Sequence, residues 1–353
     1  MTWRNNLRAV KPYVAGEQPK FSEMIKLNTN ENPYPPSPKV QKALEVFSTE
    51  HLRLYPSADA EELRTALAAY YGLAENQIFI GNGSDEVLSL SFLTFFNSPK
   101  PLIMPDISYS FYPVYCKLYG IKYKKVPLAL DFSLRANDYF QENGGIVFAN
   151  PNAPTGIYLD LTEIEKILQK NPDSVVLVDE AYIDFGGQTA LPLLKKYENL
   201  VITRTFSKSR SLAGIRLGIA LGNSEAITRL YDVKNSFNSY PIDMLAQKVG
   251  LASVQDDDYF KQTVAKVVTT REKFKQTMQQ LGFELTNSQT NFVFVKHPSI
   301  SAQDLFDVLY DEKIIVRHWN SPRISEWLRI TIGTDEEMER VSNFLEKYLK
   351  ERL

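Results

Sequence analysis

Cysteine and histidine are scarce in this chain of 353 residues, and their scarcity excludes several kinds of protein. The one cysteine, Cys116, cannot form a disulfide within the chain, so the sequence is not that of a disulfide-stapled domain. The three histidines, His51, His297 and His318, are widely spaced and form neither an HExxH nor an HxH pattern. Because zinc and iron–sulfur sites need clustered thiolate or imidazole ligands, we expect no metal in this protein.

An excess of positive charge and a long apolar run are also missing. Lys and Arg number 40 against 42 Asp and Glu, and this formal net charge of −2 argues against a nucleic-acid partner. The longest apolar stretch, residues 87–96 (VLSLSFLTFF), has about half the length of a bilayer span and is interrupted by Ser and Thr. The N-terminal segment lacks the apolar core of a secretory signal. We therefore expect a soluble, cytoplasmic protein that does not enter a membrane.

The composition that remains is that of a globular protein, with 44% hydrophobic and 23% charged residues and a length suited to about two domains. Residues 1–40 are rich in Asn and Pro, and we expect an arm that packs with the small domain or a partner subunit. Residues 41–245 alternate short apolar strands with helical stretches. This pattern predicts a large α/β domain whose mostly parallel central sheet is covered by helices on both faces. Residues 246–353 begin with a long helical stretch and continue with alternating strands, which predicts a smaller α+β domain.

Four loops that directly follow predicted strands are rich in polar residues and glycine. They are residues 81–86 (GNGSDE), 150–156 (NPNAPTG), 179–182 (DEAY) and 204–209 (RTFSKS). In an open α/β sheet, ligands bind at the carboxyl ends of the strands, so we expect these loops to meet at one edge. Taken singly, each loop also has a purely structural explanation, such as a tight turn, a helix cap or a solvated lysine.

Together, these loops contain the groups that pyridoxal 5′-phosphate (PLP) requires. Glycines that lead into a helix offer backbone N–H groups to a phosphate. The Lys208 amine can form a Schiff base, the Asp179 carboxylate can hold the pyridine nitrogen protonated, and the Tyr182 phenol can bond the ring oxygen. The sequence therefore predicts a PLP site at this edge of the sheet.

The motifs GNGSDE, NPNAPTG, VDEAY and TFSKS followed by LAGIRLG, in this order, resemble those of the PLP-dependent aminotransferases of fold type I. Within that group, KPY, LNTNENPYPPSP, LYPS and LRITIG resemble the histidinol-phosphate aminotransferase family, and the resemblance extends over essentially the whole chain. It implies amino-group transfer between glutamate or 2-oxoglutarate and histidinol phosphate or imidazole-acetol phosphate, in histidine biosynthesis. Threonine-phosphate decarboxylases and some aromatic amino-acid aminotransferases share this layout, so both activities remain alternatives.

The resemblance also implies roles for individual residues around the cofactor. Lys208 would carry PLP and move the substrate proton, Asp179 would face the ring nitrogen, and Tyr182 would bond the ring oxygen. Backbone at a glycine-led helix start, a serine and an arginine would hold the phosphate, and a tyrosine would stack on the ring. These further cofactor-binding candidates are Gly83, Ser84, Asp85, Ser207, Arg216 and Tyr109.

For the substrates, the resemblance implies that Arg329 grips the carboxylate of glutamate and the phosphate of histidinol phosphate. Tyr13, Asn30 and Arg317 are further candidates for the substrate phosphate or imidazole. Tyr55 would reach the cofactor phosphate of a second subunit, which implies a homodimer with shared active sites.

One position departs from the family pattern. The family usually has Asn directly before the PTG of the NPNAPTG motif, where it bonds the cofactor ring oxygen, but this chain has Ala153. The neighbouring Asn152 would replace that contact if its side chain turned inward, although adjacent side chains of an extended segment normally face opposite ways. We therefore keep Asn152 as a cofactor-binding candidate.

Overall fold

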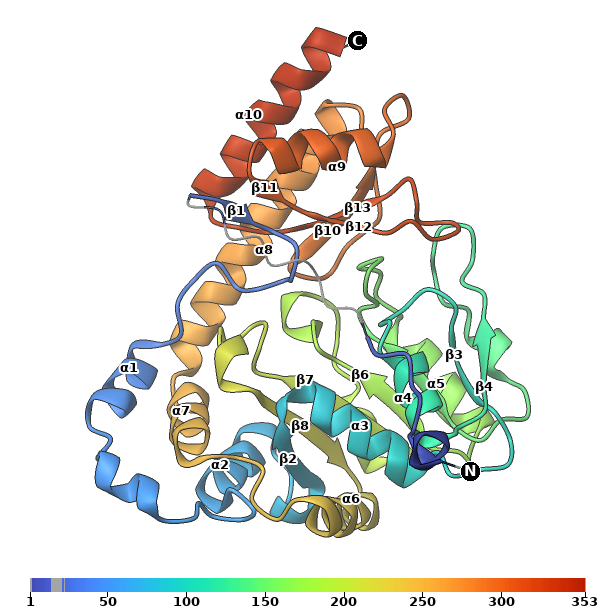
Figure 1. The fold of residues 1–353 in the computed structure, drawn as a ribbon, viewed down its shortest axis with the longest axis vertical. Helices are drawn as coiled ribbons and strands as arrows, with labels where there is room; N and C mark the ends of the chain where they lie inside the picture. The colour runs from blue at the N-terminus through green and yellow to red at the C-terminus, as the bar shows by residue number, and fades with distance from the viewer. Residues whose placement is uncertain (1, 14–20, 22, 353) are drawn as a thin grey trace.

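A seven-stranded sheet forms the centre of the structure, a computed structural model that describes residues 2–13, 21 and 23–352 (Figure 1). Its strand order is β2-β8-β7-β6-β5-β3-β4, and only β8 runs antiparallel to its neighbours. The strands are β2 (Ile78–Asn82), β3 (Leu102–Pro105), β4 (Tyr123–Val126), β5 (Ile146–Ala149), β6 (Val176–Asp179), β7 (Leu200–Thr205) and β8 (Leu217–Gly222). The predicted mostly parallel sheet is confirmed.

Both faces of this sheet are covered by helices because its strand residues point alternately into two apolar clusters. In β6, Val176 and Val178 face one cluster while Leu177 faces the other. The helices of the first cluster are α2 (Glu61–Tyr71), α5 (Leu161–Lys170) and α7 (Met244–Val254). Those of the second are α3 (Gly83–Phe95), α4 (Tyr112–Tyr119) and α6 (Ser224–Phe237). Burial on both faces explains why inner strands such as β5, β6 and β8 are almost wholly apolar.

A smaller antiparallel sheet, in the order β12-β13-β10-β9, lies above the central sheet in Figure 1. Its strands are β9 (Glu284–Leu285), β10 (Phe292–Lys296), β12 (Arg317–His318) and β13 (Leu328–Thr331). Apolar residues of α8 (Asp257–Gln280), α9 (Ala302–Asp311) and α10 (Asp335–Arg352) pack with it into a third cluster. The predicted α+β character of this part is therefore confirmed. No helix within the described residues is both long and apolar enough to cross a membrane.

The N-terminal arm packs with this smaller sheet. Its strand β1 (Ile25–Lys26) runs parallel to β11 (Ile314–Ile315), and the Leu27 carbonyl accepts from the Thr331 N–H (3.0 Å). The predicted end of the arm at residue 40 falls inside α1 (Pro38–Glu45), which lies close to α7. Short 3₁₀ helices occur at η1 (Trp3–Asn6), η2 (Thr49–Arg53), η3 (Glu75–Gln77), η4 (Ala136–Tyr139), η5 (Ile183–Phe185), η6 (Leu191–Lys195) and η7 (Ala213–Ile215).

The predicted domain limits stay a prediction, and the packing favours a shift of one of them. The limit between residues 245 and 246 falls inside α7, whose Val249 and Val254 belong to a cluster of the large sheet. Val267 and Phe274 of the next helix, α8, belong to the cluster of the small sheet. In Figure 1, α8 runs from beside α7 to the small sheet. We therefore propose that the small domain begins within α8.

Candidate active site

A cavity of about 600 Å³ lies between the carboxyl ends of the central strands and the small sheet. Its floor is formed by segments that follow β3, β5, β6 and β7, as the sheet topology requires. Its other walls come from the arm and from β12 and β13. The predicted site residues among its lining are Tyr13, Asn30, Tyr109, Tyr182, Lys208, Arg317 and Arg329. Segments from both ends of the chain thus meet at the edge predicted for the loops.

Lys208 follows β7, and its amine faces this cavity. Its Nζ donates to the Thr29 carbonyl of the arm (2.9 Å). Burial, aided by the positive charge of Arg329, lowers the pKa of the Lys208 amine to about 8. A substantial fraction of the amine is therefore neutral near physiological pH, which is the form that attacks a carbonyl carbon.

Asp179 is the last residue of β6 and is almost completely buried. Its carboxylate accepts from the Tyr112 hydroxyl (2.8 Å) and from the Thr203 hydroxyl (3.2 Å). Burial raises the pKa of Asp179 to about 6, although both hydrogen bonds favour the charged form. No basic side chain of residues 2–13, 21 and 23–352 forms an ion pair with it. A buried anion without a cationic partner suits a ligand that brings a positive charge.

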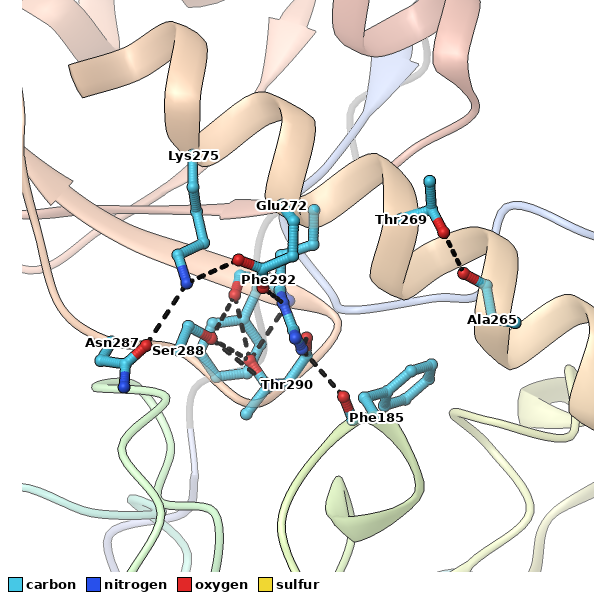
Figure 2. A network of polar contacts seen from close by, with 10 residues as sticks. Phe185, Ala265, Thr269, Glu272, Lys275, Asn287, Ser288, Thr290 and Phe292 are labelled. Carbon is cyan, nitrogen blue, oxygen red and sulfur yellow. Dashed lines mark hydrogen bonds and ion pairs between the residues drawn. The ribbon is translucent and has the colours of Figure 1, made fainter.

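Tyr182 lies three residues after Asp179, and its ring packs edge-on against Phe292 of the small sheet. Its hydroxyl oxygen accepts from the Asn30 amide (2.8 Å), and burial raises the pKa of the Tyr182 phenol. The segment that follows it is fixed by Arg271 of α8, which donates to the carbonyls of Phe185 (3.0 Å) and Thr290 (2.8 Å). Figure 2 shows these two carbonyl-bearing residues on separate loops beside α8. Tyr182 is therefore held from both domains.

A glycine turn at the start of α3 lies directly against β8. A Cβ atom on Gly218 would lie 2.5 Å from the Ser84 nitrogen, and a Cβ atom on Gly83 would lie 2.6 Å from Arg216 Nη2. Gly83 also has φ +77°, which favours glycine. The Arg216 guanidinium lies within 3.5 Å of the Ser207 hydroxyl. Backbone N–H groups, a hydroxyl and a guanidinium thus converge as in a phosphate site.

Asp85 links this turn to the cavity. Its carboxylate forms an ion pair with Arg216 (3.0 Å) and accepts from the Tyr109 hydroxyl (2.9 Å). Both partners of the ion pair are more than one-third exposed, so the pair contributes little to stability. Its effect is to orient the guanidinium and the tyrosine ring, which lines the cavity.

Arg317 and Arg329 form the basic part of the cavity. They are cross-strand partners on β12 and β13, and both guanidinium groups lie over the Trp319 ring, at 5.3 and 5.1 Å from its centroid. Arg329 donates to the Asn28 carbonyl (2.7 Å), but its Nε has no partner among the described residues. Burial, and next the charge of Arg317, lower the pKa of Arg329 to about 10, so it stays charged. Two adjacent cations with an unpaired donor suit an anionic ligand.

With this geometry, the comparison with known proteins is decisive. Residues 22–345 match the sequence profile of aminotransferase class I and II. The chain belongs to this aminotransferase family.

Similar proteins agree with that assignment. A histidinol-phosphate aminotransferase of Lactococcus lactis subsp. cremoris is 67% identical over 352 residues, covering 100% of this chain and 99% of the relative. Among solved structures, a histidinol-phosphate aminotransferase of Sinorhizobium meliloti in complex with PLP superposes with TM-score 0.83 at 23% identity, covering 93% and 92% of the two chains. An L-threonine-O-3-phosphate decarboxylase of Porphyromonas gingivalis gives 0.78 at 22% identity, covering 93% and 100%. At these identities the two structures show the shared fold alone.

Tyr55 is a predicted site residue that lies outside the cavity of this aminotransferase in the single chain. It is 80% exposed and stacks on Tyr240, with ring centroids 4.8 Å apart. Tyr13, by contrast, lines the cavity and stacks on Phe111 at 4.3 Å. The role of Tyr55 toward a second subunit therefore stays a prediction.

Asn152 and Ala153 face different surroundings. The Asn152 amide accepts from the Ser108 hydroxyl (2.8 Å) and donates to Ile107 and Thr155 oxygens (both 3.0 Å). Ala153, rather than Asn152, lines the cavity. The Asn152 side chain is thus engaged in the loop itself, and its cofactor contact stays a prediction.

Several residues of the aminotransferase site had no assigned role in the sequence interpretation. Tyr112 and Thr203 hold Asp179, and the Asn32 amide donates to the carbonyls of Lys208 (3.1 Å) and Ser209 (3.3 Å). Tyr112 lies in the tyrosine-rich segment after β3, and this concentration of tyrosines could have indicated a role for Tyr112 in the site. Nothing in the local sequence indicates that Asn32 meets residues 176 or more positions away.

Proposed function

We propose that this aminotransferase exchanges an amino group between glutamate/2-oxoglutarate and histidinol phosphate/imidazole-acetol phosphate, in histidine biosynthesis. The observation that carries the proposal is the 67% identity to a histidinol-phosphate aminotransferase over the full chain. The cavity supports it, since a reactive amine and two adjacent arginines face one space. A cytoplasmic location, where small-molecule substrates are available, is part of the proposal.

The residues present fit PLP, the cofactor of the family. Lys208 supplies the amine, Asp179 the buried anion for a protonated ring nitrogen, and the Gly83 turn with Arg216 the phosphate site. When bound there, PLP supplies an electron sink that lets the substrate Cα–H bond break. The protein would hold the cofactor and the substrate in position and place charged side chains beside them.

Each side chain then has a defined task. The negative charge of Asp179 would keep the cofactor ring nitrogen protonated, because a buried anion stabilises a positive charge that lies beside it. The Lys208 amine, with its lowered pKa, would move the proton between the substrate Cα and the cofactor C4′ carbon. Tyr182 donates to the ring oxygen. The Asp85 carboxylate, which accepts from the Tyr109 hydroxyl, would hold the Tyr109 ring in place to stack on the cofactor.

Arg329 and Arg317 bind the substrate anion. Their guanidinium groups can take the planar carboxylate of glutamate or the phosphate of histidinol phosphate, which has no carboxylate. One basic pair would therefore serve both half-reactions, and Tyr13, which lines the same cavity, would contact the substrate. This sharing explains why the pair is left without a protein carboxylate: no acidic residue forms an ion pair with either arginine among the described residues.

The active protein is proposed to be a homodimer. Tyr55 and Tyr240 are exposed together, at 80% and 45%, beside other exposed apolar residues of the same two segments. These are Leu44, Val46, Leu52, Leu54 and Phe237. A second copy would cover this surface and place its Tyr55 at the cofactor phosphate of the first. Sedimentation should show a dimer that Val46→Asp dissociates, whereas Leu130→Asp, at another exposed leucine, should leave it intact.

The activity is tested with histidinol phosphate, with and without 2-oxoglutarate. Glutamate should form in proportion to the histidinol phosphate consumed, and turnover should stop without the keto acid. Release of CO₂ from threonine phosphate without any keto acid would support the decarboxylase instead. Faster glutamate formation with phenylalanine or tyrosine would support the aromatic alternative.

A further inference from the structure

Asn30 has one fixed position beside the small sheet. Its backbone is left-handed (φ +55°), a conformation that asparagine adopts more readily than most residues. Its N–H donates to the Thr331 hydroxyl on β13 (3.1 Å), and its carbonyl accepts from the Asn291 amide (3.0 Å). Only 1% of the residue is exposed. The position of this side chain is therefore set by the arm and the small sheet together.

The Thr331 hydroxyl also decides which end of the Asn30 amide faces Tyr182. Because this hydroxyl accepts from the Asn30 N–H, its own hydrogen remains to donate to Asn30 Oδ1 (3.0 Å). The Asn30 NH₂ group then points to the Tyr182 oxygen (2.8 Å). An amide in the opposite orientation would take away the only acceptor that the described residues offer to the Thr331 hydrogen.

The direction of this bond determines where the Tyr182 hydrogen lies. Since the Tyr182 oxygen accepts from Asn30, its hydrogen is directed elsewhere, and no described residue accepts it. Tyr182 lines the cavity, so the hydrogen is available to a ligand there. Donation by Asn30 also favours the charged form of the phenol, which makes that hydrogen a better donor.

Because the Ala153 side chain cannot donate a hydrogen bond to the cofactor ring oxygen, the Tyr182 hydrogen is more important for that contact. The methyl group of Ala153 lines the cavity where the family usually has an asparagine amide, and the Asn152 amide is engaged by Ser108, Ile107 and Thr155. Of the side chains considered for the ring oxygen of PLP, which are Asn152, Ala153 and Tyr182, Tyr182 is thus the one left to donate.

We propose that Asn30 is a positioning residue, which holds the Tyr182 hydroxyl hydrogen toward the cofactor ring oxygen and compensates for Ala153. The inference rests on the proposed PLP-dependent function. It differs from a direct contact between Asn30 and substrate, because it acts on the cofactor before any substrate is present.

The test is a pH titration of the absorption band of bound PLP without substrate, in the parent and in Asn30→Gly. Glycine accepts the left-handed backbone and removes only the side chain. A hydrogen bond to the ring oxygen stabilises the deprotonated form of the Lys208-bound cofactor. Weakening it should therefore raise the titration midpoint, by about 0.5 to 1 pH unit. The dissociation constant of PLP should rise as well.

Three further variants distinguish a change in the orientation of the Asn30 amide from a general loss of packing around it. Asn30→Asp should raise the midpoint more than Asn30→Gly, because a carboxylate only accepts and would draw the Tyr182 hydrogen away from PLP. Thr331→Val, which loses the hydroxyl that orients Asn30, should also raise it. Thr331→Ser keeps the hydroxyl and should titrate like the parent. A general loss of packing would not distinguish serine from valine in this way.

Ala153→Asn gives a second, independent measurement. A restored amide at the cavity should lower the parent midpoint, and the Asn30→Gly shift should become smaller in this background because two donors then share the ring oxygen. Unchanged midpoints in Asn30→Gly and Asn30→Asp, with a raised KM for histidinol phosphate, would overturn the inference in favour of a substrate contact. Absence of a PLP band or of transamination in the parent would instead overturn the proposed function.

Discussion

The two sides of the cavity differ in how fully their polar groups are paired. On the large-domain side, Asp179 accepts from two hydroxyl groups, and Arg216 has a carboxylate and a hydroxyl close by. On the small-domain side, Arg329 lies beside Arg317, a like charge, and its Nε has no partner within residues 2–13, 21 and 23–352. The first side is preorganised for a resident ligand, whereas the second stays incomplete until a substrate anion arrives. Chemistry and substrate binding are thus assigned to different domains.

Lys208→Ala should have the largest effect, because it removes the reactive amine from the large-domain side. We expect loss of the visible band of protein-bound PLP and a fall in kcat of more than about 10⁴-fold. Absorption spectra and steady-state rates measure both. Lys195→Ala, at an exposed lysine outside the cavity lining, should behave like the parent. A borohydride-reducible adduct in Lys208→Ala would refute the role of Lys208.

Asp179→Asn should bind PLP but lower kcat by roughly 10² to 10⁴-fold, a cost of several kcal/mol on the barrier. The amide keeps the shape of the carboxylate and removes the charge that holds the ring nitrogen protonated. Stopped-flow rates with histidinol phosphate measure the loss. A kcat within about twofold of the parent would separate Asp179 from the chemistry.

Arg329→Lys should act on the other side, through binding. A lysine keeps the charge but loses the planar fork, so kcat/KM should fall about 10- to 100-fold for both glutamate and histidinol phosphate. Arg317→Lys should cost less, because Arg329, which the Asn28 carbonyl orients, would still bind the anion. Loss of activity toward only one of the two substrates would show that the basic pair is not shared.

The pH dependence of PLP capture by the apoprotein should show the smallest effect. The neutral amine reacts, and burial lowers the pKa of Lys208 to about 8. The capture rate should therefore rise between about pH 6 and 8 and level off above that value. A rate that keeps rising toward pH 10, as for an ordinary lysine, would contradict the lowered pKa.

The two sides of the cavity also differ in how much of each could be predicted from the sequence. Asp179 is the last residue of a buried strand, and Tyr182 and Lys208 each lie three residues past one, so the strand order brings their segments to one sheet edge, as predicted. The α/β fold, the smaller α+β part and the family were likewise predicted and are confirmed. These features depend on local patterns and on contiguous motifs.

The small-domain side could be predicted only in part, because its contacts join distant segments. Asn30 meets Thr331 across 301 positions, and Asn30 was assigned to substrate with no indication of its bond to Tyr182. The domain limit inside α7 was placed by a change of pattern, whereas packing of Val249 decides which core the helix joins. Neither fact is encoded in a single segment.

The division of labour between the two sides is tested most directly by single-turnover kinetics with histidinol phosphate in the parent, Asp179→Asn and Arg329→Lys. We predict that Asp179→Asn lowers the rate at saturation and changes the half-saturation concentration by less than about threefold. Arg329→Lys should mainly raise the half-saturation concentration. The opposite pattern, with Asp179→Asn altering binding and Arg329→Lys altering only the saturated rate, would contradict the account.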